Sequence, residues 1–125
     1  MKSKAIGFLG ERAVCRYLQQ QGYRIVSRNF TVRGGEIDII ASCDDVLAFV
    51  EVKTRKVDSM VTGMEAVTPA KQRVLIRTAQ QYLLRFPDSA QPRFDVAEVR
   101  VDENGELYLQ YIKNAFDASG LGVIL

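Results

Sequence analysis

The chain has 125 residues, of which 47% are hydrophobic and 26% are charged. This length fits one domain that buries a core without disulfide bonds, and the composition excludes a disordered tail. No stretch approaches the roughly eighteen consecutive apolar residues that a membrane span needs, and the N-terminus leads into a helical pattern instead of an apolar signal core. A cytoplasmic protein that does not contact a membrane is therefore expected.

Histidine is absent, and Cys15 and Cys43 are the only cysteines. The lack of histidine excludes His-ligated metals, Ser-His-Asp and Cys-His catalysis, and a histidine general base. The two cysteines lack the paired spacing of a zinc site, so we interpret both as small buried apolar residues.

The N-terminal part predicts a helix followed by three strands. Residues 4–21 form an amphipathic pattern that Gly22 is expected to cap, and the residues that recur on its apolar side are Ala5, Phe8, Leu9, Ala13, Tyr17 and Leu18. Strands are predicted over residues 23–32, 36–42 and 46–53. A tight turn at Asp44–Asp45 makes the second and third strands antiparallel neighbours.

The C-terminal part predicts a second helix and two more strands. Residues 57–67 are expected to form a loop that lies close to a functional site. Thr68 is the expected N-cap of a helix that begins with Pro69 and ends before Pro87, with a buried stripe of Val74, Leu75, Thr78, Ala79, Tyr82 and Leu83. Strands over 93–101 and 107–112 are joined at Asn104–Gly105 by a predicted type I′ turn.

This order of elements predicts one α/β domain over residues 1–125, with a mixed sheet flanked by helices. The tail, residues 114–125, is weakly patterned. It is expected to pack on the domain or to meet a second subunit.

Acidic residues alternate with apolar ones in two of these strands. Glu36 and Asp38 share one face of the second strand, and Glu51 and Lys53 share one face of the third. The opposite, apolar face, which carries Ile37 and Ile39 on the second strand, is expected to be the core. Antiparallel pairing would bring Asp38 close to Glu51.

Two carboxylates held so close repel each other unless a proton or a cation lies between them, and a divalent ion with oxygen ligands is a common solution. The alternative is a solvated polar face, on which Glu51 and Lys53 form an ordinary ion pair that contributes little.

Charge distribution along the chain is uneven, although the net charge is only +2. A surface that faces phosphates, opposite an acidic back, would produce this asymmetry; solvated charged faces are the alternative. The basic residues around the acidic motif are Arg24, Arg28, Arg33, Lys53, Arg55, Lys56, Lys71, Arg73 and Arg77, and the later acidic residues are Asp88, Asp95, Glu98, Asp102, Glu103 and Glu106.

The acidic motif resembles the PD-(D/E)xK nuclease superfamily, with Asp38, Glu51 and Lys53 at its three positions and Ile37 in place of the proline. A wider match, up to about Val101, is similar to the YraN-type family of bacterial proteins, which is described as uncharacterised and as similar to archaeal Holliday junction resolvases. The segments that carry this match are Gly10-Glu11-Arg12-Ala13, Arg28-Asn29-Phe30, Arg33-Gly34-Gly35-Glu36-Ile37-Asp38, residues 49–55 and Lys71-Gln72-Arg73.

The resemblance implies a restriction-endonuclease-like αβββαβ core and a nuclease that uses Mg²⁺ or Mn²⁺. In this reading Asp38, Glu51 and the Val52 carbonyl bind the metal, and Lys53 orients or deprotonates the attacking water. Glu11 would be a further ligand, or otherwise an exposed helical residue paired with a basic neighbour. The expected accessory residues are Glu36 and Gln72, and the expected phosphate contacts are Arg33, Arg55, Lys71 and Arg73.

The expected substrate is branched or single-strand-containing DNA, as in repair or recombination, because a small domain has little surface with which to read bases. Symmetric cutting of a junction would require a homodimer. The alternative function is a nucleic-acid-binding module that retains the nuclease fold without cutting.

Overall fold

The computed structural model describes residues 3–58 and 66–118. Its elements confirm the predicted order of one helix, three strands, a second helix and two more strands: α1 (Ser3–Gln20), β1 (Arg24–Val32), β2 (Gly35–Cys43), β3 (Val46–Lys56), α3 (Pro69–Arg85), β4 (Gln91–Val101) and β5 (Leu107–Phe116). Most of the predicted loop and the end of the predicted tail lie outside the described residues. Within the described ranges, no helix is both long and apolar enough to cross a membrane.

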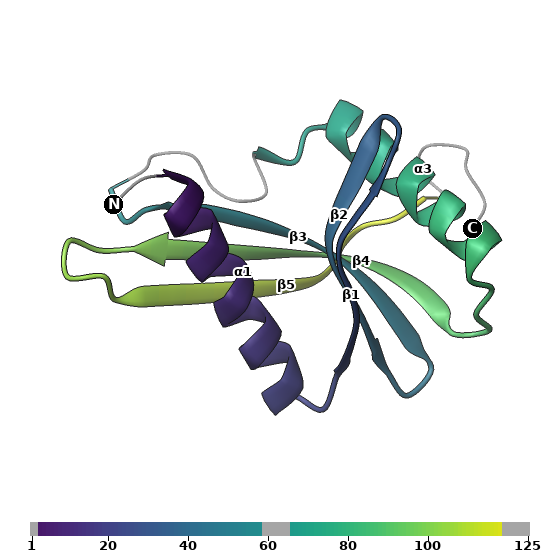
Figure 1. The fold of residues 1–125 in the computed structure, drawn as a ribbon, viewed down its shortest axis with the longest axis horizontal. Coiled ribbons are helices and arrows are strands. Elements are labelled where there is room, and N and C mark those ends of the chain that lie inside the picture. Colours follow the sequence, from purple (N-terminus) through teal and green to yellow (C-terminus); the bar gives the residue numbers. More distant parts are fainter. Residues whose placement is uncertain (1–2, 59–65, 119–125) are drawn as a thin grey trace.

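The sheet is mixed, as predicted, with strand order β1-β2-β3-β4-β5. Strands β3 and β4 are parallel, because the chain crosses back through α3, and the other neighbours are antiparallel. In Figure 1, α1 lies across the arm formed by β3, β4 and β5, whereas α3 lies beside the β1–β2 hairpin. The two helices pack on opposite faces of the central strands.

The core lies on both faces of the sheet, so the expectation of a single apolar core face is wrong. Along β3, Leu47 and Phe49 pack into the cluster that includes residues of α3, while Ala48 and Val50 pack into the cluster that includes residues of α1. Ile37 and Ile39 also belong to different clusters. The reason is that α1 and α3 each bury an apolar stripe, so neither face of the central strands is left to water.

The two predicted helix caps, at the C-terminus of α1 and at the N-terminus of α3, are confirmed. Gly22 has φ 93° and ends α1 in a Schellman motif, in which Tyr23 N–H donates to the Leu18 carbonyl and Gly22 N–H donates to the Gln19 carbonyl. Thr68 caps α3, because its side chain accepts a hydrogen bond from Lys71 N–H.

The apolar side predicted for α1 is wrong at its N-terminal end. Val14, Cys15 and Leu18 are buried against the sheet, but Ala5 is exposed and 56% of Phe8 is exposed. The buried row of the helix is Gly10, Val14 and Leu18, spaced at i, i+4 and i+8, and the prediction missed Val14. Ala5 and Phe8 lie off this row.

Two expectations about the β4–β5 hairpin are also wrong. Gly105 has a positive φ but Asn104 does not, so the turn is not type I′. Instead, the Asp102 carboxylate accepts hydrogen bonds from the N–H groups of Asn104 and Glu106, and this stabilises a longer turn. Strand β5 continues past Ile112 to Phe116, because an irregularity in its pairing with β4, at Phe94/Val96, accommodates the extra residues.

Glycines let both helices approach the sheet closely. A Cβ atom added at Gly10 of α1 would lie 2.0 Å from Thr54 Oγ1 on β3, and one added at Gly35 of β2 would lie 2.0 Å from Thr78 Oγ1 on α3. Such distances are far inside van der Waals contact. Gly10 therefore sets the height of α1 above β3, and with it the position of the next residue, Glu11.

This packing predicts opposite effects for two glycines of the same helix. Gly10→Ala should lower the free energy of unfolding by about 1–3 kcal/mol, because α1 must move away from Thr54. Gly7→Ala should leave stability unchanged or raise it by up to about 1 kcal/mol, since no heavy atom lies within 4 Å of the added methyl group. Urea denaturation of both variants measures the difference.

Thr54→Ala in the Gly10→Ala background should recover part of the loss, because Thr54 Oγ1 is the atom in conflict. A Gly10→Ala variant as stable as the unmodified protein would contradict the assigned contact.

Candidate active site

The candidate site lies where β2 and β3 separate. Their backbone pairing ends at Ile39↔Val50, although both strands continue beyond this pair. Asp38 and Glu51 are the next residues on the two strands, and the Asp38 carboxylate, instead of a backbone carbonyl, accepts the Val52 N–H at 2.8 Å. In Figure 1, the β1–β2 hairpin turns away from the arm of β3, β4 and β5. The predicted register, which brings Asp38 close to Glu51, is confirmed.

Glu51 is a buried carboxylate with little to compensate its charge. Only 6% of the residue is exposed, and burial, followed by repulsion from Asp38, raises the pKa of Glu51 to about 7. Lys53 Nζ lies 3.4 Å from Glu51 Oε1, and both Lys53 and Lys71 act in the opposite direction without cancelling the effect of burial.

The pKa of Asp38 is also raised, although opposing effects act on it. Burial raises its pKa, the hydrogen bond from Val52 N–H lowers it, and the neighbouring charge of Glu36 raises it again. A proton or a cation would stabilise the pair formed by Asp38 and Glu51 at neutral pH.

Asn29 connects two further carboxylates to this region. It lies opposite Asp38, between the pairs Arg28↔Ile39 and Phe30↔Ile37, in a left-handed conformation with φ 54° that asparagine tolerates better than most residues. With its side-chain nitrogen turned toward them, the amide donates to Glu11 Oε1 at 2.9 Å and to Glu36 Oε1 at 3.2 Å.

The asparagine therefore joins α1 to the β1–β2 hairpin beside the site. Glu11 is close enough to Asp38 for its pKa to be raised, first by burial and then by the Asp38 charge.

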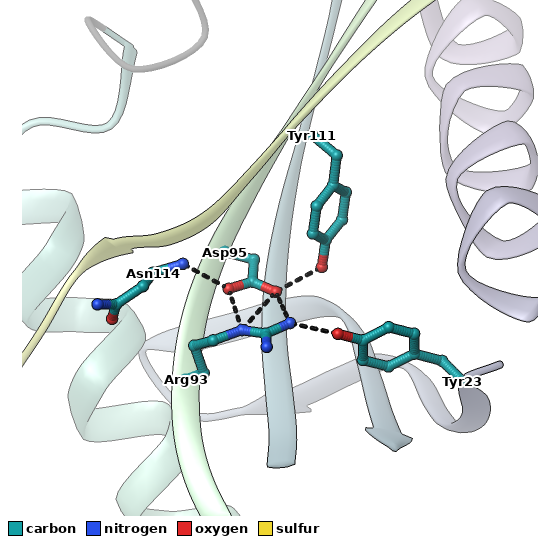
Figure 2. Close-up of polar contacts among 5 residues, drawn as sticks. All are labelled: Tyr23, Arg93, Asp95, Tyr111 and Asn114. Atoms are coloured by element: carbon teal, nitrogen blue, oxygen red, sulfur yellow. Dashed lines mark hydrogen bonds and ion pairs between the residues drawn. The ribbon is translucent and has the colours of Figure 1, made fainter. Parts of the chain in front are cut away.

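A second buried carboxylate, Asp95, shows what a fully compensated acid looks like in this fold (Figure 2). Its side chain has no exposed surface, and both oxygens accept hydrogen bonds from the Arg93 guanidinium. Tyr111 Oη donates to Oδ2 at 2.6 Å and Asn114 N–H donates to Oδ1 at 2.9 Å, while Arg93 also donates to Tyr23 Oη.

The Asp95 cluster ties β4 to β5 and to the start of β1, which is a structural role. The prediction of an acidic back is wrong for Asp95 and Glu98, since both are buried; Glu98 accepts a hydrogen bond from Arg100. Asp38 and Glu51 differ from Asp95 because no arginine pairs with them among the described residues.

The predicted phosphate contacts lie at different distances from the carboxylates. Lys71, in the first turn of α3, is close enough to lower the pKa of both Asp38 and Glu51. Arg73 lies two residues further along the same helix and is exposed. Arg55 lies on β3, two residues beyond Lys53, and its Nε is buried without a hydrogen-bond partner in the described part of the chain. Arg33 is exposed at the β1–β2 turn.

Gln72, an expected accessory residue, lies in the first turn of α3. Its side-chain Nε2 donates to the Val67 carbonyl at 3.1 Å, so the amide group is used to fix the start of α3.

The donor set suits a hard divalent cation that keeps several water ligands. Among residues 3–58 and 66–118, no three histidine, cysteine, aspartate or glutamate side chains come close enough together to form a metal cage. Two carboxylates, Asp38 and Glu51, do come together. Mg²⁺ is usually bound by one or two carboxylates, with water and phosphate oxygens completing its coordination, so this pair fits such an ion.

Two residues near the site were not predicted from the sequence as site residues. The position of Asn29 within a strand is the one available signal, because asparagine is uncommon in strands and favours left-handed backbone. Phe8 was assigned to the core, since nothing in helical spacing distinguishes an exposed member of an apolar stripe.

A mixed sheet covered by α1 and α3, with paired carboxylates where two central strands separate, is consistent with a restriction-endonuclease-like core. Residues 10–99 match the model of the Uncharacterised protein family UPF0102, and the chain belongs to this family, as the resemblance to YraN-type proteins implied.

The chain matches several relatives over nearly the whole length of both proteins. The chain is 49% identical to a UPF0102 protein of Symbiobacterium thermophilum over 93% of its own length and 99% of the relative. The corresponding values are 44%, 91% and 99% for a UPF0102 protein of Alkaliphilus metalliredigens, and 39%, 92% and 94% for one of Coxiella burnetii.

The raised pKa of Glu51 predicts how stability depends on pH when no metal is present. Because the folded-state pKa, about 7, exceeds the ordinary value of 4.5, the folded protein holds this proton more tightly than the unfolded chain does. The resulting stabilisation is complete below about pH 4.5 and is lost as the pH rises through 7, a change on the order of 3 kcal/mol.

Urea denaturation in EDTA, at a series of pH values from 5 to 8, measures this contribution. Glu51→Gln should flatten the pH profile and be more stable than the unmodified protein at the alkaline end, whereas the matched change at an exposed acid, Glu103→Gln, should leave the profile intact. A profile that is unchanged in Glu51→Gln would show that Glu51 does not carry the proton.

Proposed function

We propose that the protein is a metal-dependent nuclease of the PD-(D/E)xK type that hydrolyses phosphodiester bonds of DNA, with branched or single-strand-containing DNA as its substrate. The observation that carries this proposal is the pair of buried carboxylates, Asp38 and Glu51, beside Lys53 and Lys71. Two acids that are costly to ionise on their own form a poor surface for a polyanion. They form a good one once a cation is bound between them.

Asp38 and Glu51 would hold the ion, together with the Val52 carbonyl. Among the described residues no third carboxylate joins this pair, so Glu11 would have to leave its hydrogen bond with Asn29 to contact the ion. Bound Mg²⁺ or Mn²⁺ would supply a Lewis acid that lowers the pKa of a water and neutralises charge on the scissile phosphate. Glu51 would release its proton as it becomes a ligand. The hydrogen bond from Val52 N–H keeps Asp38 oriented.

Lys53 would place a compact positive charge beside the attacked phosphate, where it stabilises the negative charge that develops in the transition state. Its ion pair with Glu51 holds the ammonium group on the same face of β3 as the carboxylate. Lys71 approaches the same carboxylates from α3.

The proposed substrate preference rests on the small size of the domain, and the homodimer remains a prediction that follows from the symmetric cutting of a junction. A module that binds DNA without cutting is the competing function.

Cleavage of labelled linear, flapped and four-way DNA, with Mg²⁺, with Mn²⁺ and with EDTA, tests the proposed reaction. Lys53→Ala should slow cleavage by about a hundredfold or more, as the loss of a preorganised charge does. Asp38→Asn and Glu51→Gln should abolish cleavage yet bind DNA in EDTA as tightly as the unmodified protein or more tightly, because they remove charges that repel phosphate. Glu103→Gln is the exposed control.

The absence of cleavage on every substrate, with binding intact, would favour the non-cleaving module. Loss of binding in EDTA by the two carboxylate variants would overturn the metal-site assignment.

The basic residues predict a separate effect on binding alone. Lys71→Ala, Arg73→Ala and Arg55→Ala should each weaken binding similarly across sequences and reduce the slope of log affinity against log salt by about 1, because each phosphate contact releases counterions. Arg85→Ala, in the last turn of the same helix as Lys71 and Arg73, is the matched control. Fluorescence anisotropy over a salt series measures the slope, and equal slopes for Arg73→Ala and Arg85→Ala would contradict the assignment.

A further inference from the structure

An open cavity of about 410 Å³ lies beside the carboxylates, and the proposed reaction assigns no part of the substrate to it. Its lining comes from the first half of α1 and from β1: Lys4, Gly7, Phe8, Glu11, Arg28 and Asn29. Cavities of this size are typical of sites that hold small molecules or single groups of larger ones.

Phe8 is the unusual member of this lining. It is 56% exposed, although it belongs to a helix whose following apolar residues, Val14 and Leu18, are completely buried. An exposed aromatic ring that borders a cavity offers a flat apolar surface for stacking. The neighbouring position, Gly7, has no side chain that could cover this part of the cavity.

The charges around Phe8 suit an anionic ligand. Lys4 and Arg28 are exposed and border the same cavity. The only acid in the lining is Glu11, whose carboxylate accepts a hydrogen bond from Asn29 and interacts electrostatically with Arg28. A ligand with a planar apolar part and a phosphate would therefore meet a ring and two cations.

The position of the cavity connects it to the carboxylate pair. Asn29 lies opposite Asp38 in the β1–β2 register, and Glu11 is close enough to interact with Asp38. A DNA strand whose phosphate lies at Asp38 and Glu51 would bring a neighbouring nucleotide to this cavity.

We propose that the cavity beside Phe8 is a subsite for one unpaired nucleotide, whose base stacks on the Phe8 ring while Lys4 and Arg28 contact its phosphates. Stacking on an aromatic side chain requires a base that has left the duplex, and it tolerates any base because every base has a π-face. This inference rests on the proposed nuclease function and deepens it: the preference for branched or single-strand-containing DNA comes from this subsite. A second copy of the chain, or a protein partner, is the competing occupant of the same surface.

The chain contains no tryptophan, so one introduced residue can report on the subsite. When the Phe8→Trp variant is titrated in EDTA, single-stranded DNA should quench the tryptophan fluorescence. A blunt duplex of the same sequence should quench it far less. Tyr108→Trp is the matched control, because Tyr108 is similarly exposed, at 57%, and lies on the β4–β5 hairpin. It should respond weakly and equally to both DNAs.

The Phe8→Leu variant removes the aromatic ring and therefore tests the stacking contact directly. It should weaken the binding of single-stranded and flapped DNA about tenfold, the size expected for one stacked base, and leave the weak binding of blunt duplex unchanged. Because Phe8 is exposed, the variant should fold, and circular dichroism with urea denaturation checks this. Lys4→Ala and Arg28→Ala should reduce the salt dependence of binding instead.

Each other outcome overturns the subsite. Normal binding of unpaired DNA by Phe8→Leu, or equal quenching at positions 8 and 108, would remove Phe8 from DNA recognition while leaving the carboxylate site untouched. If Phe8→Leu instead changes the oligomeric state in light scattering without changing DNA binding, the surface is a contact between copies. Binding of no DNA at all would overturn the nuclease proposal as well.

Discussion

The end of the β2–β3 pairing at Ile39↔Val50 is the constraint on which the candidate site depends. Up to this pair, β2 and β3 form a continuous antiparallel ladder, and most of its side chains are buried in the two core clusters. Beyond it, β2 leaves β3, and Val52 N–H would lose its partner without the Asp38 carboxylate. Asp38, which accepts this N–H where the strand pairing ends, is thereby placed beside Glu51. The separation of β2 from β3 therefore also brings the two carboxylates together.

The buried acids differ in how far their surroundings compensate their charge. Asp95 is surrounded by Arg93, Tyr111 and the Asn114 N–H, and these groups provide the hydrogen bonds that a buried charge requires (Figure 2). Glu51 has one lysine at 3.4 Å and a second carboxylate as its neighbour. A buried acid without an arginine, such as Glu51, is the one whose charge an ion or a proton would compensate.

The position of α1 decides what surrounds the carboxylates. Gly10 allows this helix to pack against Thr54, with Glu11 within reach of Asn29 and Phe8 exposed at the border of the cavity. An extra methyl group at Gly10 would therefore move Glu11 and Phe8 together. The contact at Gly10 therefore sets the distance between α1 and β3. Through it, the same contact positions Glu11 and Phe8, which face the region of the carboxylates.

The sequence by itself determined the order of the elements, the capping of both helices and the closeness of Asp38 to Glu51. Each of these depends on local rules: the strand period of two residues, the short Asp44–Asp45 turn and the Thr68–Pro69 signal.

Only the tertiary structure decided which residues of an apolar stripe are covered, that Asp95 is buried and that Asn29 meets Glu11. These features join different elements of the chain, and the hydrogen bond from Arg93 to Tyr23 in the Asp95 cluster spans 70 residues. No local period carries that information, because burial and pairing depend on where one element crosses another, and that is fixed by packing of the whole domain.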